Sequence, residues 1–438
     1  MAEFAAPSTF DVCALSPARE KVGDAESALK LVASLSDGAA VEAVKLSNKS
    51  YTAPAAHALA GKLATLRGLT DVDVSDVIAG RPEDEALEVL GALSAALAAA
   101  AGGGDAAAAA HTALDVSDNA LGQKGIDALL PLFVGAAPLR SLKTCNNGMS
   151  EAAARQLADL ATRSGSTALE TFHYFNNMSG DGGAAAVARI VAASPGLVDL
   201  RFSGTRAGRA GSLEFARSLA GRHALVALDL ADNSFGAEGG AVLGAWLDAS
   251  NAKNGSAILA SLNLRDCSLG DDGFAPVAAA LGSCVALRAL DISGNELTHE
   301  SCGAPWLRAL QALESLGVEE NEIGSLGGAK LARALTGAKL PNLATFLTAT
   351  NELASGGAIA LCEAVLEAAP NLERLELNGN ALDGAALERL AAALNAAGKG
   401  DILGEMDDND EDLADDDDLE AYDWAEDDLA AGLAGSSI

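Results

Sequence analysis

The stretch LVALDLADNSF at residues 225–235 decides the fold of this chain. It follows the pattern L-x-x-L-x-L-x-x-N-x-L, with phenylalanine in the last position. The pattern returns as LRALDISGNEL at residues 287–297, as LERLELNGNAL at residues 372–382, and in about a dozen frames altogether. A pattern that recurs at a fixed period is typical of a leucine-rich-repeat solenoid. Such a fold stacks its repeats and presents a long concave surface to another protein.

The ninth position of each frame has a structural role that follows from its chemistry. After each short strand the chain turns away and leaves backbone groups unpaired inside the stack, and an asparagine amide can donate to them and accept from them. Asparagine fills eight of the twelve positions, and the first two frames lack it, as expected of terminal repeats. In order, the twelve residues are Lys49, Val77, Asn119, Asn147, Asn177, Thr205, Asn233, Cys267, Asn295, Asn321, Asn351 and Asn380.

The interval between these positions predicts the class of repeat. Most intervals lie near 28 residues, which leaves room for a strand, a loop and a helix. We therefore expect an α/β solenoid resembling ribonuclease inhibitor, with a curved parallel sheet inside and helices outside. Two intervals are longer, 42 residues from Val77 to Asn119 and 34 residues from Asn233 to Cys267. Insertions in a solenoid often lie at its binding face.

The first insertion combines Gly80-Arg81-Pro82, an apolar stretch from Ala86 to Ala101, and the flexible Gly102-Gly103-Gly104. The apolar stretch holds an acidic residue and is shorter than a membrane span, so it predicts a buried helix. Arg81 follows a predicted strand and is expected at the rim of the sheet. A helix-entry loop is the alternative interpretation, because proline and the acidic residues after it suit a helix N-terminus.

Acidic residues are unevenly distributed along the chain. It has 61 acidic and 29 basic residues, and residues 401–438 hold 16 acidic residues and no Lys or Arg. Such charge runs repel themselves and stay disordered. We expect residues 1–40 to form an N-terminal cap, residues 41–400 a domain of about 12 repeats, and residues 401–438 an acidic, disordered tail. In that tail Tyr422 and Trp424 are candidates for transient docking, and a merely solubilising tail is the alternative.

Composition and motifs exclude several classes of function. A chain this acidic repels phosphate backbones and anionic lipid. The six cysteines and five histidines show no CxxC or HxxxH spacing, so we expect no disulfide framework or zinc site and a reducing, intracellular compartment. Neither a G-x-x-x-x-G-K-[ST] motif nor a G-x-S-x-G motif occurs. The sequence predicts a protein-binding chain with no enzyme active site or cofactor of its own.

Two groups of residues are candidates for partner contacts. Asn146 precedes the internal Asn147 and should project at the rim, with a turn-forming asparagine as the alternative; Asn176-Asn177 repeats the pair. An acidic inner face would steer a basic partner, with an ordinary solvated sheet face as the alternative. Its members, on predicted strands and the loops after them, are Asp71, Asp73, Asp76, Asp115, Asp118, Asp229, Asp232, Asp291, Glu319 and Glu376.

A resemblance to a known family rests on four stretches: LSNKS at residues 46–50, residues 74–85 with their AGRPE, SDNALG at residues 117–122, and NNGMS at residues 146–150. Together they resemble the Ran GTPase-activating proteins. The continuation ALEV at residues 86–89 resembles the plant and green-algal members most, and the family also carries an acidic tail after its repeats. The resemblance covers roughly residues 40–410.

The resemblance implies stimulation of GTP hydrolysis on the small GTPase Ran, in support of nucleocytoplasmic transport. GTPases are slow alone because the attacking water and their own glutamine are poorly ordered. The matching asparagine, Asn146, would orient that glutamine, and Arg81 would support the contact surface without acting as an arginine finger. The implied partner is Ran-GTP, alone or in a ternary complex with a Ran-binding protein. GTP and Mg²⁺ would belong to the GTPase, and the chain would be a monomer that binds neither nucleic acid nor membrane.

Two departures from the family affect the expected location. Residues 1–40 contain no Trp and are too short for the Trp-Pro-Pro targeting domain of plant relatives, and the C-terminal modification domain of animal relatives is missing. We therefore expect a cytoplasmic or perinuclear protein. The competing hypothesis is a non-catalytic binding scaffold or inhibitor, which would bind tightly and accelerate nothing. A flagellar or cytoskeletal repeat protein would not predict the acidic tail.

Overall fold

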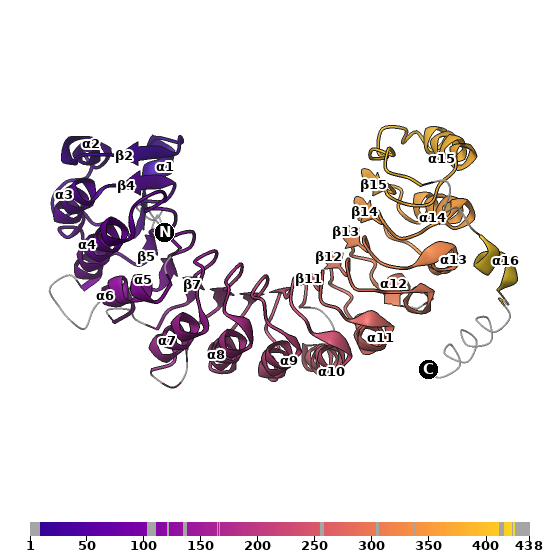
Figure 1. Cartoon of the computed structure of the whole chain (residues 1–438), viewed down its shortest axis with the longest axis horizontal. Helices are drawn as coiled ribbons and strands as arrows, with labels where there is room; N and C mark the ends of the chain where they lie inside the picture. Colours follow the sequence, from indigo (N-terminus) through magenta and orange to yellow (C-terminus); the bar gives the residue numbers. More distant parts are fainter. Residues whose placement is uncertain are drawn as a thin grey trace, which may run out of the picture. The chain divides into compact units, whose positions relative to one another are not determined.

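The computed structural model describes residues 9–424, with gaps at 103–110, 121, 135–137, 164, 166, 255–257, 304–305, 337, 411–415 and 423. The chain divides into two compact units, Met1–Ala224 and Leu225–Ile438. In each unit, short parallel strands lie side by side and helices cover one face of them (Figure 1). The prediction of an α/β leucine-rich-repeat solenoid, with helices on the outside of a parallel sheet, is confirmed.

In the first unit the main sheet pairs its strands in parallel. Its strands are β1 (Thr9–Asp11), β3 (Ala43–Lys45), β5 (Asp71–Asp73), β6 (Ala113–Asp115), β7 (Ser141–Lys143), β8 (Thr171–His173) and β9 (Asp199–Arg201). A small second sheet pairs β2 (Glu20–Val22) with β4 (Lys49–Tyr51). The described helices are α1 (Val12–Leu15), α2 (Ala25–Leu31), α3 (Ala53–Leu63), α4 (Glu83–Gly102), α5 (Gly122–Ala128), α6 (Leu130–Val134), α7 (Glu151–Ala161), α8 (Gly180–Ala192) and α9 (Arg209–Ser218).

The second unit repeats the arrangement. Its strands are β10 (Ala227–Asp229), β11 (Ser261–Asn263), β12 (Ala289–Asp291), β13 (Ser315–Gly317), β14 (Thr345–Leu347) and β15 (Arg374–Glu376), each parallel to the next. Its described helices are α10 (Gly236–Asn254), α11 (Gly270–Leu281), the 3-10 turn η1 (His299–Ser301), α12 (Trp306–Ala309), α13 (Gly324–Leu335), α14 (Ser355–Ala368), α15 (Gly384–Ala396) and α16 (Asp417–Ala421).

The register of the strands separates a core face from an open face. Each strand of the main sheet is three residues long with a buried middle residue, and these middle residues pair across strands, as Val72 does with Leu114 and Leu114 with Leu142. Each leucine buried in this way contributes roughly 2 kcal/mol. Side chains alternate along a strand, so the first and third residues lie on the open face, opposite the helices.

The asparagines at the ninth position perform the predicted structural role. Asn119 is 1% exposed; its Nδ2 donates to Val74 O (2.8 Å), and its Oδ1 accepts from Val77 N (3.0 Å). We call these buried residues the ladder asparagines. In the first frame Lys49 replaces asparagine, and its buried ammonium group donates to the carbonyls of Ser16 (2.7 Å) and Ala18. A different side chain thus satisfies the carbonyls at this end of the unit.

The long insertions are extended helices. α4 is 20 residues long, against 11 for α3, and buries Val89, Leu90 and Leu97, which confirms the predicted buried helix. By length and composition alone α4 would also qualify as a membrane span, and half of its apolar window is buried inside the unit. The second insertion lengthens α10 to 19 residues. Gly103 and Gly104, predicted to be flexible, lie outside the described residues.

The ends of the repeat domain differ from the predicted boundaries. At the N-terminus, β1 already pairs with β3 in the main sheet, so the cap shares the sheet. At the C-terminus the frame does not stop at residue 400: Leu375 N donates to Ile402 O (2.9 Å), and Asn409 Oδ1 accepts from Asn380 N (3.0 Å). A last strand leaves a row of unpaired backbone groups. Residues 401–410 form a partial frame that pairs with them.

Part of the acidic tail lies against α13 and α14. The Asp416 carboxylate accepts from Gly356 N (2.9 Å) at the start of α14 and from Ser325 Oγ. Lys330 Nζ lies 4.5 Å from the Tyr422 ring centroid, and the Arg333 guanidinium lies 5.2 Å from that of Trp424. Both aromatic residues of the tail are therefore docked.

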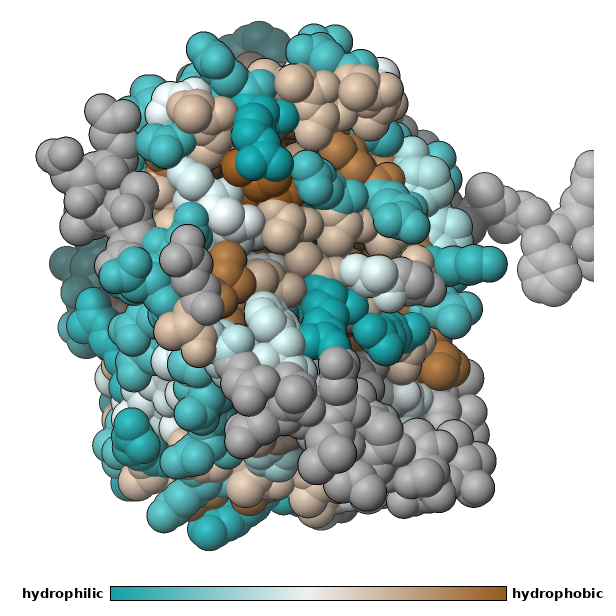
Figure 2. Space-filling view, turned by 90° about the vertical axis from the view of Figure 1, so that its right-hand side faces the viewer, coloured by the Kyte–Doolittle hydropathy of each residue, from teal (hydrophilic) through white to brown (hydrophobic). Residues whose placement is uncertain are grey.

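On the face seen in Figure 2, hydrophilic side chains alternate with hydrophobic patches.

Candidate functional site

A row of residues in the first unit precedes the ninth positions of successive frames. We call Asn48, Asp76, Asp118, Asn146 and Asn176 the rim row. All five have left-handed backbones, with φ of 59°, 49°, 61°, 50° and 53°. This conformation costs a residue with a Cβ roughly 1–2 kcal/mol, and Asn and Asp tolerate it best because their short polar side chains bond locally. Asn146 is therefore both a turn residue and a rim residue, so the two interpretations of it are compatible.

The side chain of Asn146 is exposed and sits in a hydrogen-bonded row. Its Nδ2 donates to Asp118 Oδ1 over 2.8 Å, and its Oδ1 accepts from Asn176 Nδ2 over 2.8 Å. The backbone is held too, because Asn146 N donates to Phe175 O (2.8 Å). A carboxamide has two N–H groups and two lone pairs. One N–H and one lone pair of Asn146 therefore remain for a partner.

Arg81 does not present its guanidinium at the rim. Its side chain is 6% exposed; Nε donates to Ser50 Oγ (3.0 Å), and Nη1 lies 3.7 Å from Glu85 Oε2. Ser50 in turn donates to Ala79 O (2.6 Å). These contacts tie the insertion loop to the preceding repeat. In this arrangement Arg81 binds the preceding repeat and does not project as a free cation.

Arg81 and Asp118 nevertheless share a groove. It has a volume of about 630 Å³ and lies between the loop before α4 and the loop before α5, with Gly80 and Lys124 also in its lining. Asp118 is the acceptor for Asn146. The structure thus brings the two halves of the predicted site, the Gly-Arg insertion and the asparagine loop, to neighbouring positions of one unit.

The predicted acidic residues of the first unit are engaged in local bonds. Asp73 Oδ1 accepts from Ser75 N (2.9 Å), and Asp115 Oδ1 accepts from Ser117 N (3.0 Å), which are Asx turns that end each strand. Asp76 binds Arg19 (2.6 Å), and Asp71 accepts from the hydroxyl of its neighbour Thr70 (2.9 Å). Burial raises the pKa of Asp115. These carboxylates have structural tasks that the strand pattern alone did not reveal.

The open face of the first unit also carries basic residues that sequence reasoning missed. The third strand position is Asp in β5 and β6, but Lys143, His173 and Arg201 in β7, β8 and β9. Lys143 Nζ lies 3.9 Å from Asp115, and His173 Nε2 lies 2.8 Å from Asp199 Oδ2. Burial lowers the pKa of His173. An alignment of the frames at the third strand position reveals this change from acidic to basic side chains.

The remaining predicted residues lie in the second unit. Asp229 and Asp291 form the same Asx turns, with Ala231 N (3.1 Å) and Ser293 N (3.0 Å). Asp232 occupies the left-handed position before Asn233, with φ of 55°. Glu319 pairs with Arg265 (3.2 Å), which also binds Glu320. Arg265 was not predicted, and it offsets part of the negative charge in this unit.

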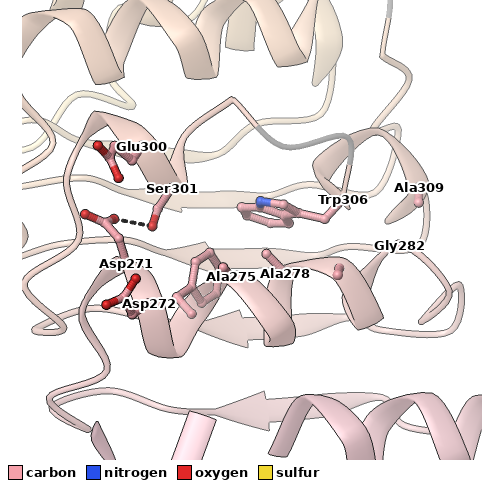
Figure 3. A pocket seen from close by; sticks show the side chains of 11 residues that line it. Asp271, Asp272, Ala275, Ala278, Gly282, Glu300, Ser301, Trp306 and Ala309 are labelled. Atoms are coloured by element: carbon pink, nitrogen blue, oxygen red, sulfur yellow. Dashed lines mark hydrogen bonds between the residues drawn. The ribbon is translucent and has the colours of Figure 1, made fainter. Parts of the chain in front are cut away.

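A groove on the helical side of the second unit arises from an irregular repeat. Between Asn295 and Asn321 the helix is replaced by η1 and the short α12, which leaves about 650 Å³ beside α11 (Figure 3). Trp306 and Phe274 meet edge to face at 5.9 Å. Asp271 at its mouth accepts from Thr298 N (3.1 Å) and from Ser301 Oγ, so this carboxylate holds the turn.

Potential metal ligands and thiols are spread over the described residues. No group of three or more His, Cys, Asp or Glu side chains there is arranged to hold a metal ion. The six cysteines are free thiols, and all except Cys13 are buried. Burial raises the pKa of Cys145 to about 11. A thiol with this pKa is protonated and unreactive at neutral pH.

Fold and repeat pattern together define a leucine-rich-repeat protein, and the family model described as Leucine Rich repeat matches residues 112–130 and 223–244. The chain is similar to RAN GTPase-activating protein 1 of Arabidopsis thaliana, with 40% identity over 100 residues, which is 23% of this chain and 17% of the relative. It is 38% identical over 121 residues to RAN GTPase-activating protein 2 of the same plant, covering 27% of this chain and 21% of the relative. The matched part thus spans about a fifth of each relative, and over that part the resemblance seen in the sequence is confirmed.

Two solved structures are also similar to the chain. An internalin (inlF) of Listeria monocytogenes aligns over 80% of this chain and 78% of its own, with 15% identity and a TM-score of 0.42. TLR13 in a complex with ssRNA13 aligns over 78% of this chain and 43% of its own, with 17% identity and a TM-score of 0.41.

Proposed function

We propose that this chain stimulates GTP hydrolysis by the small GTPase Ran and thereby supports nucleocytoplasmic transport. It acts in trans and has no nucleotide site of its own; GTP and Mg²⁺ are supplied by the GTPase. The observation that supports this most is the exposed Asn146 carboxamide, held in a hydrogen-bonded row within a chain similar to two Ran GTPase-activating proteins.

The chemistry of Asn146 suits the task. A small GTPase hydrolyses GTP slowly because the glutamine that orients the attacking water is poorly ordered. Asn146 retains one N–H and one lone pair, and a glutamine carboxamide offers the complementary lone pair and N–H. Two hydrogen bonds between the amides would fix the glutamine. Ordering a group that the reaction needs removes an entropic part of the barrier.

Arg81 supports the contact surface in this proposal. An arginine finger must place its charge on the phosphoryl group, whereas the guanidinium here is 6% exposed and bonded to Ser50 and Glu85. By holding the insertion loop, Arg81 keeps one wall of the groove that Asp118 also lines. Its loss should weaken complex formation more than it slows the reaction step.

The charges suggest how a partner would approach. Carboxylates on the open face and rim of each unit favour a basic surface and speed association; the candidate contact residues are Asp71, Asp73, Asp76, Asp115, Asp118, Asp229, Asp232, Asp291 and Glu319. The proposed complex contains one copy of this chain and Ran-GTP, and a Ran-binding protein could join it in a ternary complex. The proposed location is cytoplasmic or perinuclear.

Single-turnover hydrolysis of Ran-bound GTP tests the proposal. The concentration of this chain is varied, so that the maximal rate and the half-saturating concentration are obtained separately. Wild type should accelerate hydrolysis, and Asn146→Ala should lower the maximal rate about a hundredfold, which is typical of losing one polar group that acts in the transition state. Arg81→Ala should mainly raise the half-saturating concentration. A wild-type chain that binds Ran-GTP without accelerating hydrolysis would instead indicate a non-catalytic scaffold or inhibitor.

A further inference from the structure

We propose that Asp118 and Asn176 are positioning residues that determine which end of the Asn146 carboxamide is offered to the partner. The inference rests on the proposed function, since it concerns how Asn146 meets a glutamine side chain. It adds two residues to the site: one, Asp118, was predicted only as part of an acidic face, and the other, Asn176, was predicted only as a repeated pattern.

A carboxamide needs such control because its two ends have nearly the same size. The last torsion of asparagine is broad and roughly two-fold, so an exposed amide with no neighbours would turn over freely. A turn by 180° exchanges its donor and its acceptor. A partner that needs a donor on one side and an acceptor on the other would then meet the wrong arrangement half of the time.

The two neighbours of Asn146 remove this ambiguity. Asp118 is a carboxylate, which only accepts hydrogen bonds, so Asn146 must turn Nδ2 toward it (2.8 Å). Asn146 Oδ1 then faces Asn176 and accepts from its Nδ2 (2.8 Å). The row therefore donates in one direction only, from Asn176 through Asn146 to Asp118. Reversing Asn146 alone would bring its oxygen against a carboxylate and two N–H groups against each other.

The backbone fixes the spacing of the row. Asp118 N donates to Cys145 O (2.9 Å), Asn146 N to Phe175 O (2.8 Å) and Asn176 N to Ser203 O (2.9 Å). Directly beneath, the ladder asparagines bond from frame to frame, as Asn147 N does with Asn177 Oδ1 (3.1 Å). The three side chains are thus held at one repeat spacing, within reach of each other, before any partner arrives.

The direction of the row matters for the reaction. If Asn146 is reversed, a glutamine can keep both hydrogen bonds only by reversing its own amide. Its NH₂ group would then take the place of the carbonyl oxygen that orients the attacking water. Binding would survive this exchange, because the number of hydrogen bonds is unchanged, whereas the reaction step would slow.

A swap of the two neighbours tests the inference. The double variant Asp118→Asn with Asn176→Asp keeps the net charge and can keep both side-chain hydrogen bonds, but it reverses the direction of the row. We expect an unchanged melting temperature and an unchanged half-saturating concentration of the chain toward Ran-GTP. The maximal single-turnover rate should be about tenfold lower, which corresponds to the free energy of roughly one hydrogen bond.

Single variants and a control sharpen the result. Asp118→Asn alone should lower the maximal rate by about twofold, because the new amide fits either orientation of Asn146 and the productive one is then populated about half of the time. Asn176→Asp alone should be slower, because it places a carboxylate against Asn146 Oδ1. Thr350→Ala is the control; it changes a left-handed rim residue of the second unit, φ 54°, and should leave the rate unchanged. Added to Asn146→Ala, the swap should cause no further loss, since it acts through that residue.

The possible outcomes separate the two claims. If wild type accelerates hydrolysis and the swap variant is equally fast at saturation, the positioning role is wrong while the proposed function stands. The same holds if the swap changes only the half-saturating concentration, or if it slows Asn146→Ala further. If wild type itself does not accelerate hydrolysis, the proposed function fails and the inference fails with it.

Discussion

Replacing one ladder asparagine tests the physical account of the fold most directly. In Asn119→Ala the side chain that is lost is 1% exposed and serves several backbone groups. Two of its acceptors keep another donor: Val116 O still accepts from Asn147 Nδ2 (3.1 Å), and Ser117 O from Asp76 N (3.0 Å). Val74 O and Val77 N, which Asn119 binds at 2.8 and 3.0 Å, lose the side-chain bonds that hold them.

The expected loss of stability follows from those two groups. A buried polar group left without a partner costs roughly 1–3 kcal/mol, so we expect Asn119→Ala to lower the free energy of unfolding of the first unit by about 3 kcal/mol. Urea denaturation followed by circular dichroism measures it. The matched control is Asn371→Ala, an exposed asparagine, with an expected change of about 0.5 kcal/mol. A loss below about 1 kcal/mol in Asn119→Ala would refute the view that the ladder holds the repeats together.

Three further predictions concern other parts of the chain. Burial raises the pKa of Asp115 above its ordinary value of 3.8, so the wild type should lose stability as the pH rises from 3.8 through the raised pKa. The variant Asp115→Asn, which copies the Asx turn of Asn263, should lack this loss. Thermal melts of both proteins between pH 3 and 7, roughly the range of carboxyl titration, would show the difference. Native alkylation with iodoacetamide, located by mass spectrometry, should modify Cys13 before Cys145, whose pKa is about 11; equal rates would contradict the burial of Cys145. Asp416→Ala removes the acceptor for Gly356 N at the start of α14 and should cost about 1 kcal/mol in urea denaturation, whereas an unchanged stability would mean that the tail contact is energetically neutral.

The repeat pattern predicted the strands, the helices and the ladder because each depends on local spacing. Three apolar positions and one asparagine per frame define a short strand and the turn after it, and about 28 residues leave length for one helix. The buried helix α4 was predictable for the same reason, since its apolar residues recur at helical spacing. The rim position of Asn146 followed from its place next to Asn147, because neighbouring residues of such a turn point in different directions.

Other features depend on contacts between frames and were not predictable from one frame. The side chain of Arg81 turns inward because Ser50, 31 residues earlier, accepts its hydrogen bond. The partial frame at residues 401–410 keeps Asn409 but places Gly404 and Met406 where leucines are usual, so the leucine pattern does not reveal it. The Asx turns of Asp73 and Asp115 are different, because each lies within its own loop and is predictable from one frame; the alternating strand pattern indicated only surface charge there.

The rim position itself separates what the fold requires from what function requires. A left-handed backbone is all that the turn demands there, and glycine meets that demand at the least cost. Glycine occupies the position at Gly204, Gly294 and Gly379, with φ of 58°, 64° and 68°. The fold therefore does not need asparagine at residue 146. In the proposed function, the exposed carboxamide at this position, which stands between an obligate acceptor and a second amide, serves a contact with another molecule.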